Sequence, residues 1–288
     1  MPELPEVEVV KKSLKKTINH LTFKKIEILN KYLRYQIDEK LMKKMIKSKI
    51  LSVSRRSKYI LLRLDNNYTI IIHLGMTGKI IISDMKNNKR RSSFYYSLSD
   101  DNPIHNHLIF NFNNNIRIIY NDVRKFGFIK IEKTKRLLQN PHLKKLGPEP
   151  LSKKFNPKYF KNFIKKRKIT LKDLLMNQNF VAGLGNIYVN EAIFLSQINP
   201  RIEVFRIPDK KITDLILNIK DVLKKAINEG GSSIKDFYGT HGQEGKFQQF
   251  FNVYGREGER CRRLKCKGKI NIIRISNRST FYCDKCQK

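Results

Sequence analysis

The sequence contains few acidic residues: 25 Asp and Glu stand against 60 Lys and Arg, a formal net charge of +35. Solubility needs far less charge than this, so the imbalance predicts a polyanionic partner, either nucleic acid or an anionic membrane surface. Lys, Asn and Ile are abundant throughout the chain, which indicates a bias of composition as well. Roughly a third of the excess charge is therefore assigned to a solvated surface without phosphate contacts.

The sequence has no apolar run of membrane-spanning length. Its opening residues, MPELPEVEVV, are acidic and interrupted by proline, unlike a secretory signal. These two absences favour nucleic acid over a membrane as the partner and predict a soluble, intracellular protein. The composition is 40% hydrophobic over 288 residues, enough for two domains and a small appendage with ordinary cores.

Cysteine is absent from most of the chain, and all four cysteines follow the pattern Cys261-x4-Cys266-x16-Cys283-x2-Cys286. In a chain without an export signal, such clustering favours a metal site over disulfides. The closing C-x2-C is a zinc half-site, and a spacing of four still lies within the range of zinc knuckles. A hairpin of this size has little core for free thiols to fill. We therefore expect the four cysteines to hold one structural Zn²⁺.

Short segments rich in β-branched and aromatic residues occupy roughly the first 130 residues and predict a β-sandwich or barrel. A helix is expected before them, because Val7, Val10 and Leu14 recur at helical spacing after the prolines of PELPEVE. The predicted strands are Ile26–Leu29, Lys58–Leu64, Thr69–Leu74, Lys79–Ile82, Leu108–Phe112 and Ile116–Tyr120.

Helical patterns dominate after LGPEPLSKKFNP, whose prolines and glycine predict a hinge. The polar, glycine-rich stretch Tyr238–Gly245 is expected to be a loop. The fold class is thus α+β with several domains: a helix and sandwich at 1–133, a hinge at 134–150, a helical domain at 151–250 and a cysteine-bearing hairpin at 251–288. The predicted helices are Tyr159–Lys166, Leu171–Met176, Ile187–Gln197 and Lys211–Gly230.

Pro2 becomes the N-terminal residue if methionine aminopeptidase removes Met1, as it usually does before a small residue. A free α-amino group has a pKa near 7.7–8.0, against roughly 10.4 for lysine, so part of it is unprotonated at neutral pH. Such an amine can attack an aldehyde-like carbon, in DNA the sugar C1′, and form a Schiff base. Glu3 could protonate the sugar ring oxygen, and Glu6 could position the nucleophile or a water. Alternatively, the Pro-Glu start merely begins a helix.

The chain resembles the formamidopyrimidine-DNA glycosylases over nearly its whole length. Its opening, MPELPEVE, is similar to the signature of that family, and further motifs match in order. The resemblance implies a bacterial DNA-repair enzyme that excises oxidised purines, 8-oxoguanine and formamidopyrimidines, and then cuts the strand by β,δ-elimination. The matching motifs are RRSKY at 55–59, HLGMTG at 73–78, DVRKFG at 122–127, LGPEPL at 146–151, GLGNIY at 183–188 and TFYCDKC at 280–286.

Catalytic roles follow from this resemblance, position by position. Pro2 would be the Schiff-base nucleophile and Glu3 the proton donor. Lys58 matches the lysine implicated in β-elimination, although a surface lysine at a strand start is the simpler interpretation in so lysine-rich a chain. Arg278 matches the arginine on the zinc hairpin that binds phosphate and assists δ-elimination.

The resemblance also implies how the chain would hold DNA. Extruding a base leaves a gap in the duplex, which costs roughly a few kcal/mol unless it is filled. Met76, Arg124 and Phe126 match the residues that fill this gap. A thioether and an aromatic ring wedge the stack, and the guanidinium bonds the widowed base. The other matched DNA-contacting positions are His105, Arg167, Lys172 and Asn186.

Further implications concern the domains and the partner. The helical domain would be a helix-two-turn-helix, the hairpin a zinc finger presenting Arg278, and Tyr238–Gly245 the cover over the lesion. The expected partner is duplex DNA containing oxidised bases, bound by a monomer in the cytoplasm, at the nucleoid.

The sequence departs from the family's usual pattern at two places. The family usually has two residues between the first two cysteines, and it commonly has Pro-Arg-Arg where this chain has Val123-Arg124-Lys125.

Two other classes of protein compete with this interpretation. The endonuclease VIII type prefers oxidised pyrimidines, but it usually opens with Pro-Glu-Gly-Pro-Glu, whereas this chain has Leu4. A non-catalytic DNA-binding protein could have kept the scaffold. The presence of Pro2, Glu3 and Lys58 argues against it, because phosphate binding alone does not require that N-terminus.

Overall fold

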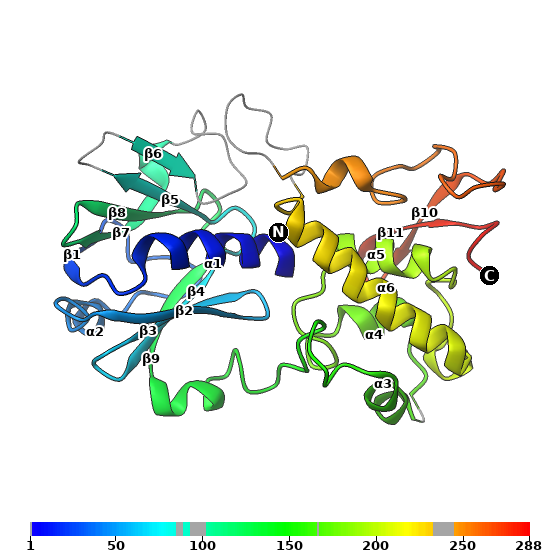
Figure 1. The fold of residues 1–288 in the computed structure, drawn as a ribbon, viewed down its shortest axis with the longest axis horizontal. Helices are drawn as coiled ribbons and strands as arrows, with labels where there is room; N and C mark the ends of the chain where they lie inside the picture. The colour runs from blue at the N-terminus through cyan, green and yellow to red at the C-terminus, as the bar shows by residue number, and fades with distance from the viewer. Residues whose placement is uncertain (1, 85–88, 93–101, 166, 233–244) are drawn as a thin grey trace. The chain divides into compact units, whose positions relative to one another are not determined.

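The computed structural model describes residues 2–84, 89–92, 102–165, 167–232 and 245–288 (Figure 1). It divides into two compact units: unit 1 comprises Met1–Lys144 and Glu229–Lys246, and unit 2 comprises Lys145–Asn228 and Phe247–Lys288. The predicted loop at Tyr238–Gly245 falls outside the described residues except for Gly245. Within the described ranges, none of the helices combines the length and the apolar character that crossing a bilayer demands.

Unit 1 consists of an N-terminal helix and two antiparallel sheets (Figure 1). One sheet has five strands in the order β1-β7-β8-β5-β6, and the other has four in the order β2-β3-β4-β9. The nine strands are β1 (Phe23–Ile28), β2 (Ile50–Arg56), β3 (Tyr59–Leu64), β4 (Tyr68–His73), β5 (Lys79–Asp84), β6 (Lys89–Ser92), β7 (Asn106–Phe112), β8 (Ile116–Asn121) and β9 (Phe128–Lys133). The short helical elements are α2 (Glu39–Lys43), η2 (Pro103–His105) and η3 (Thr134–Gln139).

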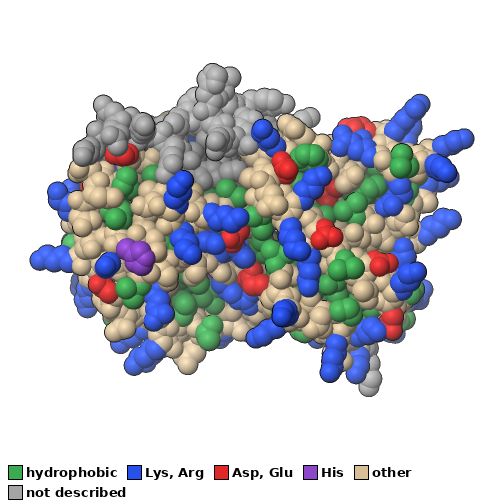
Figure 2. Space-filling view, in the orientation of Figure 1, with side chains coloured by type: hydrophobic (Ala, Val, Ile, Leu, Met, Phe, Trp, Pro, Cys, Tyr) green, Lys and Arg blue, Asp and Glu red, His purple; other side chains and the backbone are tan. Residues whose placement is uncertain are grey.

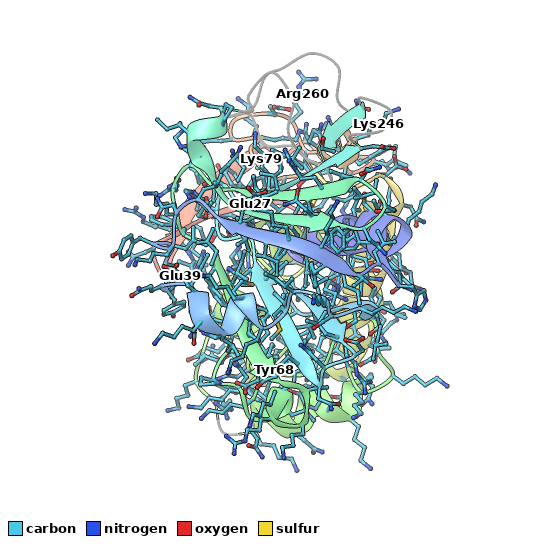
Figure 3. The ribbon with its side chains drawn as sticks, turned by 90° about the vertical axis from the view of Figure 1, so that its left-hand side faces the viewer. Glu27, Glu39, Tyr68, Lys79, Lys246 and Arg260 are labelled. Atoms are coloured by element: carbon cyan, nitrogen blue, oxygen red, sulfur yellow. The ribbon has the colours of Figure 1, made fainter. Side chains whose placement is uncertain are left out.

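A single core fills the space between the two sheets. Helix α1 (Leu4–Ile18) contributes Val7, Val10 and Leu14, each at most 3% exposed, together with buried aliphatic and aromatic side chains of both sheets. The helical spacing read from the sequence is thus the spacing of its buried face. In Figure 3, Glu27 of β1 and Lys79 of β5 lie in one layer and Tyr68 of β4 lies in the other. The predicted sandwich with a leading helix is confirmed.

Unit 2 is built around the helix α5 (Asn186–Leu195), whose residues from Ile187 to Phe194 are all buried. Two neighbouring helices are capped by side chains, because the Asn156 carboxamide accepts from the Tyr159 N–H at 2.9 Å and Thr170 Oγ1 accepts from the Asp173 N–H at 3.1 Å. The remaining elements are α3 (Pro157–Ile164), α4 (Leu171–Met176), η4 (Val204–Arg206), α6 (Asp209–Asn228), η5 (Phe247–Phe250), β10 (Ile270–Ile275) and β11 (Arg278–Cys283). The four predicted helices are present, with ends shifted by a few residues.

Strands β10 and β11 form a tight hairpin closed by Ser276 and Asn277. Both residues have positive φ, 46° and 60°, the conformation of a type I′ turn, whose twist matches that of the strands. Ile275 therefore pairs directly with Arg278. The hairpin presents Arg278 as the first residue after the turn, with its side chain exposed.

Candidate active site and nucleic-acid interface

Two buried carboxylates lie at the start of α1. Glu3 is 3% exposed and Glu6 is 0% exposed. Glu6 Oε2 accepts from the Glu3 N–H at 2.8 Å, and its Oε1 accepts from the N–H of Ser232 at 3.0 Å and from the Ser232 hydroxyl at 3.3 Å. Pro2, which is also buried, directly precedes this first turn. The Glu6 carboxylate thus links the backbone next to Pro2 to Ser232. The Glu3 N–H is one of the groups that a helix start leaves without an intrahelical partner.

Lys58 occupies the turn between β2 and β3, where Ser57 has a φ of 54°. Arg55 links this turn to α1: its Nε donates to Glu8 Oε2 at 2.8 Å and its Nη1 donates to the Ser57 carbonyl at 2.7 Å. Burial alone would raise the pKa of Glu8, but hydrogen bonds and charge from Lys11 and Arg55 outweigh it and hold that pKa below its usual value. Lys58 is 6% exposed, so it is not the exposed surface lysine of the simpler interpretation.

The predicted gap-filling residues occupy two turns that touch each other. Met76 and Phe126 are 38% and 45% exposed, and the Arg124 Cζ lies 4.4 Å from the centre of the Phe126 ring. A Cβ atom on Gly75 would lie 2.4 Å from the Gly127 nitrogen, so this close approach requires glycine. The structure therefore brings the three side chains together, from segments far apart in the sequence.

His73 received no role from the sequence, although it opens the HLGMTG motif. Its ring stacks on Phe128 with centroids 5.3 Å apart and lies 5.0 Å from the Tyr59 ring. Its Nδ1 accepts from the Gly75 N–H at 3.1 Å, so this nitrogen carries no proton. Burial, together with the nearby positive charge of Lys58, lowers the pKa of His73 to about 4. A neutral histidine thus supports the turn that carries Met76.

His105 ends the short helix η2 and is half-buried. Its carbonyl accepts from the Asp122 N–H at 3.0 Å, which ties η2 to the turn that carries Arg124. Of the predicted DNA-contacting positions in unit 1, His105, Met76, Arg124 and Phe126 therefore belong to one group of adjoining loops.

In unit 2, α5 and the hairpin are joined by two asparagines. Asn186 Nδ2 donates to the Ser279 carbonyl at 3.0 Å, and Asn190 Oδ1 accepts from the Phe281 N–H at 3.0 Å. Asn186 therefore lies next to the residue that follows Arg278. Asn190 was missed by the sequence analysis, because nothing in a helical pattern distinguishes a buried asparagine that bonds a distant strand.

Two basic residues predicted to contact DNA differ in exposure. Arg167 is exposed, and its guanidinium lies 4.3 Å above the Phe163 ring while its Nε donates to the Phe163 carbonyl at 2.8 Å. Lys172 is 1% exposed. A side chain so buried is not a surface phosphate contact in this conformation, and the role of Lys172 stays a prediction. Other Lys and Arg side chains are spread over the face seen in Figure 2.

The four cysteines converge at the base of the hairpin. Their Sγ atoms all lie within 4.8 Å of one another, with Cys261 to Cys286 at 3.6 Å and Cys266 to Cys283 at 3.7 Å. Four thiolates about 2.3 Å from one tetrahedral Zn²⁺ would be roughly 3.8 Å apart, so the donor set fits this ion. Hydrogen bonds from Cys286 and from the Gly268 N–H lower the pKa of Cys266 to about 7, which favours the thiolate.

Comparison with known proteins extends over the whole chain. The model of the formamidopyrimidine-DNA glycosylase N-terminal domain matches residues 1–129, and that of the formamidopyrimidine-DNA glycosylase H2TH domain matches residues 146–238. The chain is 39% identical to the formamidopyrimidine-DNA glycosylase of Ruegeria sp. (strain TM1040) and 38% identical to that of Rickettsia bellii (strain OSU 85-389). Both alignments cover 100% of this chain and 100% of the relative.

Solved structures agree with these matches. The complex between Lactococcus lactis Fpg and an abasic site containing DNA is 35% identical, with a TM-score of 0.85 and 100% of both chains covered. The same values hold for wild-type Lactococcus lactis Fpg with a N7-benzyl-Fapy-dG containing DNA.

The fold, the cysteine-bearing hairpin and these matches define a DNA-repair glycosylase of the kind that also cleaves the backbone as a lyase. The chain belongs to the formamidopyrimidine-DNA glycosylase family. The predicted family and fold class are confirmed, and the matches favour this family over the endonuclease VIII type and over a non-catalytic DNA-binding protein.

Proposed function

We propose that this enzyme excises oxidised purines, 8-oxoguanine and formamidopyrimidines, from duplex DNA through a Schiff base at Pro2. The supporting observation is the buried pair Glu3 and Glu6 around the first turn of α1, with the Lys58 turn tied to the same helix by Arg55. Burying a carboxylate costs free energy of desolvation unless hydrogen bonds compensate it, and Glu6 makes such bonds to Glu3 and Ser232. The position of the two carboxylates next to the N-terminal residue suits acid catalysis there.

The reaction would begin once Met1 has been removed. The unprotonated Pro2 nitrogen attacks the sugar C1′, the bond from C1′ to the base breaks, and the base leaves with its electron pair and a proton. Glu3 donates a proton to the ring oxygen, the ring opens, and an iminium joins Pro2 to C1′. Loss of a C2′ proton then expels the 3′ phosphate, and a second elimination expels the 5′ phosphate. Water finally releases Pro2 from the opened sugar.

Lys58 and Arg278 would serve these eliminations. Lys58 is assigned to β-elimination, where an ammonium can stabilise the departing phosphate. Arg278 is exposed at the tip of the hairpin, where a guanidinium can bind the phosphate that leaves in δ-elimination. Asn186 and Arg167, with His105, would contact phosphates around the lesion.

The four cysteines would hold one Zn²⁺ with a structural role. When bound, the ion supplies a cross-link that fixes the hairpin, which by itself has few buried residues. The enzyme would act as a monomer on DNA in the cytoplasm, at the nucleoid. The net charge of +35 supports binding to a polyanion of this kind.

Borohydride trapping tests the nucleophile. With an 8-oxoguanine duplex, reduction should link the protein to DNA, and peptide mapping should place the link at Pro2, with Met1 absent by mass spectrometry. A matched variant, Pro2→Gly, keeps an N-terminal amine but makes it primary, so trapping should persist more slowly. A link mapped to Lys58 would show that the nucleophile is wrong.

A further inference from the structure

Asp122 has no part in the proposed chemistry, yet its side chain bonds both of the exposed turns. It is 0% exposed. Its Oδ1 accepts from the Thr77 hydroxyl at 2.5 Å, and its Oδ2 accepts from the Gly127 N–H at 2.8 Å and from the Tyr120 hydroxyl at 3.3 Å. Thr77 belongs to the turn of Met76, and Gly127 ends the turn of Arg124 and Phe126. One carboxylate therefore joins the two turns.

Thr77 adds a second link between the same turns. Its hydroxyl donates to Asp122 and accepts from the Arg124 N–H at 3.0 Å. A hydroxyl has one proton to donate and lone pairs to accept, so this arrangement satisfies both. The backbone of Arg124 is thus hydrogen-bonded to the residue that directly follows Met76.

The backbone of Asp122 is fixed by two histidines of a third segment. Its N–H donates to the His105 carbonyl at 3.0 Å, and its carbonyl bonds His107 Nε2 at 2.8 Å. His107 is 1% exposed. The carboxylate that joins the turns is therefore itself anchored in the protein interior, and the turns cannot shift as a pair without breaking these bonds.

The side chains that the turns present are held only in part by packing. Met76 and Phe126 are more than a third exposed, at 38% and 45%. Their position must come from the backbone beneath them, where Gly75 and Gly127 are in direct contact. Charge-assisted hydrogen bonds to a buried carboxylate are among the stronger means of holding such a backbone.

We propose that Asp122 and Thr77 are positioning residues that hold Met76, Arg124 and Phe126 as one rigid unit, and that they thereby set the preference for the base opposite the lesion. The proposal rests on the proposed function and on the role that the family resemblance implies for Arg124, a hydrogen bond to the widowed base. A guanidinium can only donate, so it suits the O2 and N3 acceptors of cytosine and suits adenine poorly. This discrimination requires that the Arg124 backbone stay in place.

The test compares Thr77→Val with Thr77→Ser. Valine has the shape of threonine but removes both hydrogen bonds, whereas serine keeps the hydroxyl. Single-turnover excision of 8-oxoguanine is measured opposite cytosine and opposite adenine, and cleavage of an abasic site serves as the second readout. Thr77→Val should reduce the cytosine-over-adenine preference about tenfold, because loss of its two hydrogen bonds displaces the Arg124 donor. Thr77→Ser should restore most of it, and in Thr77→Val the loss of preference should exceed any loss of rate on abasic sites.

Thr69→Val is the matched control. Thr69 is 1% exposed in the same unit, and its hydroxyl bonds Thr134 at 2.9 Å, away from the two turns. It should keep the preference unchanged, so that loss of a buried threonine hydroxyl by itself is excluded as the cause. If Thr77→Val fails to fold, Asp122→Asn provides the same comparison, because it replaces one acceptor of the network by a donor.

Arg124→Ala separates this proposal from the function on which it rests. If Arg124→Ala loses the preference while Thr77→Val and Asp122→Asn both keep it, the positioning role is wrong and the role of Arg124 stands. If Arg124→Ala also keeps the preference, discrimination lies elsewhere and both assignments fall. Borohydride trapping at Pro2 is independent of either result.

Discussion

The turns of unit 1 and the hairpin of unit 2 both present exposed side chains for which we propose contacts with DNA, but they are held in different ways. In unit 1 the turns of Met76 and Phe126 sit on a large two-sheet core and are joined by the buried carboxylate of Asp122. In unit 2 the hairpin of Arg278 has a small cluster of buried residues, and two of them, Cys261 and Cys283, belong to the cysteine group. A large core can position a turn through hydrogen bonds alone, whereas a small one needs a metal.

The largest effect should follow from loss of the metal in unit 2. Cys266→Ser should abolish stoichiometric zinc and weaken DNA binding strongly, since structural zinc sites are worth roughly 10–16 kcal/mol in isolated fingers. Unit 1 should keep its fold. Metal content by mass spectrometry and hydrogen exchange of the two units measure these outcomes. Full zinc occupancy together with full activity would remove Cys266 from the ligand set.

The cysteine-bearing region at 251–288 also has a buried anchor that does not depend on metal. Glu191 of α5 is 1% exposed and accepts from the N–H groups of Asn252, Val253 and Tyr254 at 2.9, 3.0 and 2.9 Å. Glu191→Ala would leave these donors unsatisfied and should destabilise unit 2 by about 3–9 kcal/mol, at roughly 1–3 kcal/mol for each of the three donors. Glu191→Gln keeps one acceptor oxygen and should lose less. Hydrogen exchange at 252–254 should be slowest in the wild type, faster in Glu191→Gln and fastest in Glu191→Ala. Equal protection in all three proteins would contradict the assignment.

Unit 1 should respond to acid through His73. Its pKa falls from 6.5 to about 4 on folding. Between pH 6.5 and pH 4, His73 is protonated in the unfolded chain but not in the folded protein. Its contribution to the free energy of unfolding is therefore fully present above pH 6.5 and is lost progressively down to pH 4. The loss should reach about 3 kcal/mol, at roughly 1.4 kcal/mol for each pKa unit.

The matched variant for this prediction is His73→Asn, whose side-chain oxygen can still accept from the Gly75 N–H. The free energy of unfolding, measured by urea titration at pH 7 and pH 5, should depend less on pH in the variant than in the wild type. Hydrogen exchange of β3 and β4 should show the same difference. An NMR titration of His73 with a midpoint near 6.5 would contradict the expected shift.

The smallest effect concerns single phosphate contacts. Arg167→Ala should reduce the slope of log affinity against log salt by about one unit, because one contact with its released counterion is lost. Lys172 is 1% exposed, so Lys172→Ala provides the comparison. An equal change of the slope in both variants would mean that Lys172 reaches DNA after a rearrangement. An unchanged slope in Arg167→Ala would mean that Arg167 is a solvated surface residue without a phosphate contact.

Local patterns were enough for much of the fold. The apolar spacing of Val7, Val10 and Leu14 predicted α1, and six strands and four helices were expected where the structure has them. Strands β2 (Ile50–Arg56), β6 (Lys89–Ser92) and β9 (Phe128–Lys133) were not predicted. Strand β6 is entirely polar, and β2 and β9 alternate only in part and end in charged residues, so none of the three carries the full apolar signal by which strands are recognised.

The sequence by itself determined the metal-ligand pattern, the leading helix and the motifs that match the family, because each depends on residues that are neighbours along the chain. Only the tertiary structure decided which polar side chains do the positioning. Asp122 meets Thr77 across 45 residues, and Glu191 meets Val253 across 62. A carboxylate has the same local pattern whether it is solvated or buried. Its partners, and therefore its role, are set by segments that come together only when the chain has folded.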